Sequence, residues 1–160
     1  MFLRLISLFL LFSPSFTSAG ETELPLSSKY SGQYGDFKIY PINDDTVLFY
    51  FYRKYGGNSG ALLGDVKIKD GVGIFETNKY GGCKWLMKFE QKKLVIETLE
   101  NKEKCGFGSN VYAHGDHIRY SSDLPVSFPD RQEGMPVYFK DIVEKRYNKS
   151  MQPPAHAPTE

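Results

Sequence analysis

Short segments with period-two alternation run from Gly32 to about Tyr120, and glycine, asparagine and aspartate separate them. This period is typical of half-buried β-strands, whereas an amphipathic helix repeats every 3.6 residues. The strongest segment, Thr46–Arg53 (TVLFYFYR), is apolar or aromatic on both faces. We expect another segment to cover its outer face, or its tyrosines to lie flat on a barrel exterior. An exposed aromatic binding patch is the alternative.

The N-terminus resembles a targeting segment rather than part of a fold. Arg4 precedes an apolar run over residues 5–12, and small residues follow at 17–20. This order predicts a secretory signal peptide over residues 1–20, and therefore a periplasmic or secreted protein. The apolar run is shorter than the roughly 20 residues that cross a bilayer, so we expect no stable membrane insertion.

The chain has two cysteines, Cys83 and Cys105. In an exported protein an even pair predicts a disulfide, because that compartment is oxidising. Around Cys83, alternate residues are apolar, and a turn after Phe89 would pair Phe89 with Leu94. Cys105 could then fold back onto Cys83 after a few irregular residues, and a last strand would run over 110–120.

The segments predict an all-β fold, a seven- or eight-stranded antiparallel meander barrel with one disulfide and a short C-terminal helix. We expect a closed or nearly closed barrel because closure removes exposed strand edges. The expected boundaries are an N-terminal arm over 21–31, the barrel over 32–124 and an extension over 125–149. Val137–Tyr147 could form the helix, with Val137, Tyr138, Ile142 and Val143 on one stripe, and the tail over 150–160 is expected to be disordered.

The formal net charge is +1, with acidic and basic residues interspersed. Nucleic-acid binding requires a basic stripe, so no nucleic-acid partner is expected. His114, Asp116 and His117 form the one cluster with a catalytic character. Residues three apart on a regular strand face opposite sides, so we expect surface histidines. A bulge at Gly115 is the alternative, and it would allow metal binding or acid–base catalysis. We otherwise find no catalytic motif, and expect no enzyme activity, no cofactor and no metal.

Two glycine-rich connections could carry recognition residues. Residues 54–60 are expected to form a long flexible loop, and Lys-Tyr-Gly-Gly occurs both at 54–57 and at 79–82. Loops on a rigid scaffold commonly carry binding residues, and tyrosine loses little side-chain entropy on binding. The candidate protein-binding residues are Tyr55, Asn58, Ser59 and Tyr80. Plain hairpin connections without a binding role are the alternative.

Gly82-Cys83, the alternation that follows, and Cys105–Val111 (CGFGSNV) resemble a group of small exported bacterial proteins. Some members of this group are related to periplasmic lysozyme inhibitors, and the resemblance covers roughly Gly32–Tyr120. It implies a small disulfide-containing barrel that inserts a loop into an enzyme's active-site cleft. Residues 58–61 (NSGA) would correspond to that loop, although they lack its repeated Ser-Gly and its following tyrosine.

Our leading hypothesis is therefore a non-enzymatic periplasmic protein-binding barrel, an inhibitor or immunity protein whose partner is a cell-wall hydrolase or toxin. A carrier that holds a small hydrophobic ligand in the barrel interior is the first alternative. An enzyme centred on His114, Asp116 and His117 is the second.

Overall fold

The computed structural model describes residues 26–100, 105–130 and 134–147. The expected signal peptide (1–20), the first part of the expected arm and the expected disordered tail (150–160) lie outside the described residues. The elements are β1 (Ser28–Gly32), β2 (Gly35–Pro41), β3 (Thr46–Tyr55), β4 (Asn58–Lys69), β5 (Val72–Thr77), the 3-10 helix η1 (Lys79–Gly81), β6 (Cys83–Phe89), β7 (Lys93–Thr98), β8 (Gly115–Ser121), β9 (Ser127–Pro129), β10 (Pro136–Tyr138) and α1 (Phe139–Tyr147).

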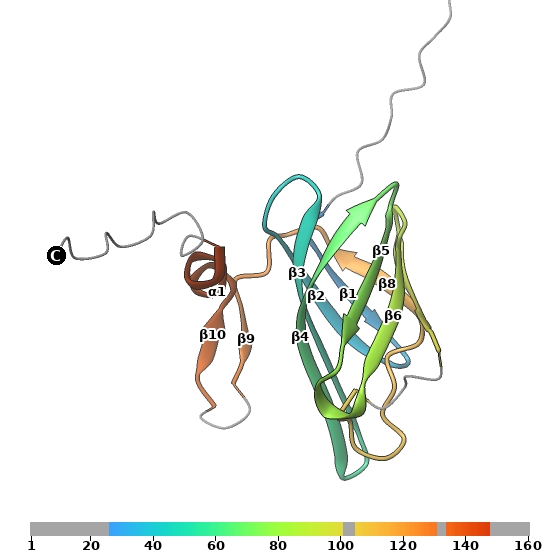
Figure 1. Ribbon diagram of the computed structural model, residues 1–160. Coiled ribbons are helices and arrows are strands. Elements are labelled where there is room, and N and C mark those ends of the chain that lie inside the picture. Colours follow the sequence, from blue (N-terminus) through green and yellow to red (C-terminus); the bar gives the residue numbers. More distant parts are fainter. Residues whose placement is uncertain (1–25, 101–104, 131–133, 148–160) are drawn as a thin grey trace, which may run out of the picture.

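Strands β1 to β8 form a closed antiparallel barrel in chain order (Figure 1). Each strand pairs with the next, and β1 pairs with β8 to close the sheet. The predicted meander barrel, its disulfide and its short C-terminal helix are confirmed. The barrel begins at Ser28, so the last residues of the segment expected to be an arm (21–31) form β1.

The barrel interior is packed with aromatic side chains. Val47, Phe49 and Phe51 of β3 are fully buried there, as the alternation predicts. From β6, Trp85 lies 5.9 Å from Phe49 between ring centroids. Packing is tight enough that a Cβ added at Gly64 would lie 2.5 Å from the Phe75 ring. This close packing gives the end of the barrel a rigid base.

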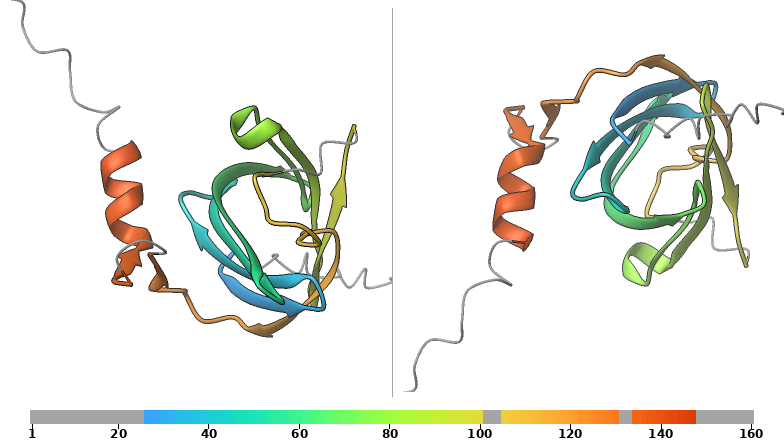
Figure 2. Two further views of the ribbon diagram at one scale, coloured as in Figure 1. Left: turned by 90° about the horizontal axis from the view of Figure 1, so that it is seen from below. Right: turned by 90° about the horizontal axis from the view of Figure 1, so that it is seen from above.

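The C-terminal extension covers the outer face of β3. This confirms the expectation that another segment would cover this face. Leu48 and Tyr50 pack with Phe128 of β9 and with Phe139 of α1. The rings of Tyr50 and Phe128 stack with centroids 4.2 Å apart. This second apolar cluster explains why both faces of β3 are hydrophobic. In Figures 1 and 2, α1 and the β9–β10 hairpin lie outside the barrel, beside β2 and β3.

The helix begins two residues later than predicted. Val137 and Tyr138 belong to β10, where they pair with Phe128 and Ser127 of β9. The prediction of helix over 137–138 was therefore wrong, because pairing with β9 places these residues in extended backbone. The side chain that α1 buries completely is Phe139.

Two predicted connections also differ from the structure. Tyr55 pairs directly with Asn58, so the expected long loop over 54–60 is a tight hairpin whose turn is Gly56-Gly57. Gly56 has φ +57, which glycine adopts at little cost. The last strand begins at Gly115 rather than at residue 110, and residues 105–114 form an irregular segment. Seen from below in Figure 2, this segment (gold) lies across the end of the ring of strands.

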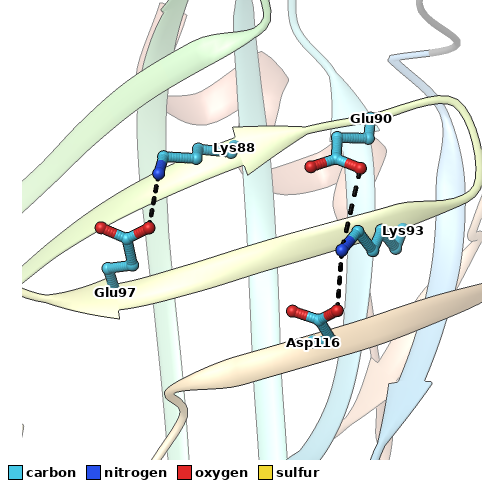
Figure 3. A network of polar contacts seen from close by, with 5 residues as sticks. All are labelled: Lys88, Glu90, Lys93, Glu97 and Asp116. Atoms are coloured by element: carbon cyan, nitrogen blue, oxygen red, sulfur yellow. Dashed lines mark hydrogen bonds and ion pairs between the residues drawn. The ribbon is translucent and has the colours of Figure 1, made fainter.

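Charged side chains pair along the outer face of β6, β7 and β8 (Figure 3). Lys88 pairs with Glu97, and Lys93 pairs with both Glu90 and Asp116. These side chains are 33–53% exposed, so each pair contributes about 0–1 kcal/mol to stability. Their arrangement nevertheless fixes opposite charges across neighbouring strands, next to the point where β8 begins.

Candidate functional site

Three segments far apart in the sequence meet at the end of the barrel that lies lowest in Figure 1. They are the β1–β2 turn at Gln33-Tyr34, the β3–β4 hairpin, and residues 105–114. Antiparallel meander order places the β1–β2 and β3–β4 turns at the same end. The five residues Tyr34, Arg53, Tyr55, Tyr112 and His114 form what we call the tyrosine–arginine cluster.

Arg53 lies at the centre of this cluster. Alternation along β3 turns Arg53 to the interior face, two residues after Phe51, and the side chain is 8% exposed. Its guanidinium carbon lies 5.0 Å from the ring centroid of Tyr34, 5.2 Å from that of Tyr55 and 5.8 Å from that of Tyr112. At these distances the ring faces attract the cation. Arg53 Nη1 also makes a long 3.5 Å contact with the Tyr112 carbonyl oxygen.

The rings around Arg53 also contact one another. His114 lies 4.7 Å from Tyr34 and 5.4 Å from Tyr112 between ring centroids. Gly115, with φ +108, allows this packing, because a Cβ there would lie 2.9 Å from Tyr34 Cδ2. Tyr34 and Tyr112 are half-buried, while His114 is exposed. The cluster is therefore an ordered aromatic surface with one enclosed positive charge.

A pocket of about 420 Å³ adjoins the cluster. Its walls come from the β1–β2 turn, the start of β2 and the end of β3, and include Arg53, Tyr55 and Asp36. Tyr55 is 54% exposed, so its ring can contact an approaching molecule while its other side faces Arg53. The surface thus combines ring faces, a buried cation and a recess.

The four predicted binding residues have different positions. Tyr55 belongs to the cluster. Asn58 and Ser59 lie beside it in β4, where the Ser59 carbonyl accepts a hydrogen bond from the Gly108 N–H. They support the irregular segment over 105–114 and are part of a strand, so the interpretation of 54–60 as a flexible loop was wrong. Tyr80 lies in η1, and its side chain is outside the described part of the structure.

His114, Asp116 and His117 do not point toward one another. The His114 ring packs at a tilt against the Tyr34 ring, and the Asp116 carboxylate faces outward, 2.8 Å from Lys93 Nζ. His117 is fully buried, so the expectation of surface histidines was wrong for this residue. His114 and His117 therefore face opposite sides, as their spacing of three residues predicts, and His117 pairs with the inward-facing Leu94 of β7. Among the described residues, no group of three metal-binding side chains is found.

His117 connects the two segments that carry the tyrosines. Its Nδ1 lies 3.0 Å from the Gly35 carbonyl oxygen, and its Nε2 lies 2.9 Å from the Ala113 carbonyl oxygen. Burial lowers the pKa of His117. The hydrogen bonds with the two backbone carbonyl oxygens and the charges of Asp36 and Asp116 raise this pKa, but by less. His117 therefore has a structural position under the cluster.

The interior offers little support for the carrier hypothesis. Phe37, Phe51 and Trp85 are at most 1% exposed and pack against one another. A ligand would have to displace these rings. The carrier stays a prediction, which native mass spectrometry of the purified protein would test by retention or uptake of a lipid-like ligand.

Sequence reasoning missed Tyr34, Arg53 and Tyr112. Arg53 carried a usable signal, because it continues the inward alternation of Val47, Phe49 and Phe51 with a charged residue. A cation on the buried face of a strand needs partners. Tyr34 and Tyr112 carried no such signal, because only closure of the barrel brings their segments together.

Comparisons with models of known protein families, with curated proteins and with solved structures find no match. In the described part of the chain no helix is long and apolar enough to span a membrane. The buried disulfide between Cys83 and Cys105 is consistent with an oxidising compartment.

Proposed function

We propose that this chain is a non-enzymatic periplasmic barrel that binds another protein through the tyrosine–arginine cluster. The observation that carries the proposal is the convergence of three tyrosines, a histidine and an arginine from three segments on one end of a rigid barrel. Tyrosine and arginine are enriched among the residues that dominate protein–protein binding energy. Preorganised aromatic side chains also lose little entropy on binding.

We propose a cell-wall hydrolase as the partner, which this protein would inhibit or neutralise. The predicted signal peptide, the disulfide and the resemblance to exported barrels related to lysozyme inhibitors support this choice. The contact surface would be the end of the barrel, where Tyr55 protrudes from the β3–β4 hairpin. A narrow projecting hairpin on a rigid base suits insertion into an enzyme cleft better than a flat sheet face would.

The direct test is capture of a partner from periplasmic extract, followed by an assay of cell-wall hydrolase inhibition. Tyr55→Ala should weaken capture by about 30-fold, as expected for loss of a central aromatic contact. Tyr120→Ala is the matched control, because Tyr120 is 61% exposed near the other end of β8 and should change capture by less than about twofold. Absence of both a captured partner and inhibition at micromolar concentration would refute the proposal.

A further inference from the structure

The buried charge of Arg53 lacks a counter-charge within the described part of the chain. Its described contacts are three tyrosine rings and one carbonyl oxygen, and none is a carboxylate. In contrast, the described lysines on the outer face of β6 and β7 pair with acids. Burying a cation costs free energy unless it is paired, and ring faces replace only part of the lost hydration.

The position of Arg53 makes it reachable from one side. Arg53 lines the pocket of about 420 Å³, together with Tyr55 and the start of β2. Tyr55 covers the guanidinium with its ring face and is itself 54% exposed at the end of a hairpin. Tyr55 is thus the ring beside the guanidinium that both lines the pocket and is exposed to solvent.

A guanidinium has five N–H donors in a planar fork that matches a carboxylate. The single contact with the Tyr112 carbonyl uses at most one of them. Charge-assisted bonds to a carboxylate are about twice as strong as neutral ones. Tyr34 and Tyr112 would hold the fork in place, so little side-chain entropy would be lost when the carboxylate binds.

We propose that Arg53 is a carboxylate-binding site, that the partner protein supplies the carboxylate, and that Tyr55 is the ring that moves to admit it. The partner as the source of the carboxylate rests on the proposed function, whereas the carboxylate site at Arg53 is independent of it. Asp36, on another wall of the pocket, is the described acid that opposes an anion there. The proposal thus names one acidic group of the partner as the group that the cluster recognises.

Sodium acetate titrated into the full chain labelled with ¹⁵N-arginine tests the site, with ionic strength held constant by sodium chloride. The Arg53 Nε–H signal should shift saturably with acetate and should not shift with acetamide, its neutral isostere. Arg146, which contacts Asp65 on the outer surface, is the internal reference and should show no saturable shift. Equal shifts with acetate and acetamide, or no saturable shift, would overturn the proposal.

Variants extend the test. In the Arg53 variants, acetate binding is measured through the Gly56 amide signal. Arg53→Gln should weaken acetate binding by about tenfold, and Arg53→Lys should weaken it by less. Asp36→Asn should strengthen it. If the Arg53 variants fail to fold, the comparison of acetate with acetamide on the unchanged chain still decides the matter.

Tyr55→Ala separates this inference from the proposed function. It should bind acetate at least as tightly as the unchanged chain, because the covering ring is gone, while capture of the protein partner weakens. A partner captured through the cluster, with no acetate effect on Arg53, would overturn the carboxylate site alone. Saturable acetate binding without any captured protein would leave the site standing and would refute both the proposed function and the partner as the source.

Discussion

His117 occupies an unusual position between two backbone carbonyl oxygens. A neutral imidazole has one N–H, so it can donate to only one of them, whereas the charged ring could donate to both. Burial opposes the charged form and dominates, so the pKa lies below its ordinary value. The acids that act on the ring are Asp36 of β2 and Asp116 of β8, and Asp116 is already paired with Lys93.

This position predicts a loss of stability in acid. The folded pKa of His117 is lower than the unfolded value of about 6.5, so the folded state disfavours the proton. The contribution of the neutral His117 ring to the free energy of unfolding is fully present above the unfolded pKa. It is lost as the pH falls through the folded pKa. Urea unfolding should therefore give a smaller free energy at about pH 5 than at about pH 7, and NMR titration should place the pKa below about 6.5.

His117→Gln supplies the control for this effect, since glutamine keeps a polar side chain that does not titrate. The decline in stability between the two pH values should be smaller in this variant. An equal decline in both proteins would mean that other groups cause it.

Gly115 provides a second prediction for a single residue. Alanine there would be strained at φ +108 and would bring its Cβ within 2.9 Å of the Tyr34 ring. Gly115→Ala should cost about 1–3 kcal/mol of unfolding free energy, measured by urea denaturation. Gly57→Ala is the control, because open space surrounds Gly57, and its effect should be much smaller. Similar losses in both variants would contradict this account of Gly115.

Among the elements, the C-terminal extension depends on Phe139. This residue is fully buried, stacks on Tyr40 with centroids 5.4 Å apart and contacts Phe128 edge-on. Phe139→Ala should weaken docking of α1 by up to about 3 kcal/mol. Hydrogen exchange should then accelerate in α1 and β10 and change little in the barrel strands β4 to β8. Tyr138→Ala, at a half-exposed position, should leave exchange in α1 nearly unchanged. Unaltered exchange in Phe139→Ala would contradict this packing.

The disulfide joins β6 to the irregular segment over 105–114. The two cysteines are 22 residues apart, and closing a loop of this length contributes about 3 kcal/mol in the chain-entropy estimate. Replacing both cysteines with alanine should lower the unfolding free energy by about this amount. The signals of Tyr112 and His114 should also broaden or shift in NMR spectra, because their segment loses its anchor. A destabilised variant with unchanged Tyr112 and His114 signals would show that the contacts of Arg53, Ser59 and His117 hold the segment without the disulfide.

For the whole molecule, the sequence predicts what depends on local pattern. Alternation identifies β3 and β6, and the paired cysteines identify the disulfide between β6 and the irregular segment over 105–114. The sequence does not predict the tyrosine–arginine cluster, because Tyr34, Arg53 and Tyr112 come together only when the meander closes. The Gly56-Gly57 turn was misjudged because the glycines that suggest a flexible loop also allow a two-residue hairpin. Phe139 was missed because the covering of β3 depends on contacts between distant segments.

We propose that the partner binds at the end of the barrel that carries the tyrosine–arginine cluster. Hydrogen exchange of the full chain, free and with its captured partner, locates the contact most directly. We expect protection at residues 33–36, 53–58 and 110–114, with β9, β10 and α1 unchanged. Protection confined to the C-terminal extension or to the opposite end of the barrel, with the cluster unaffected, would contradict the account.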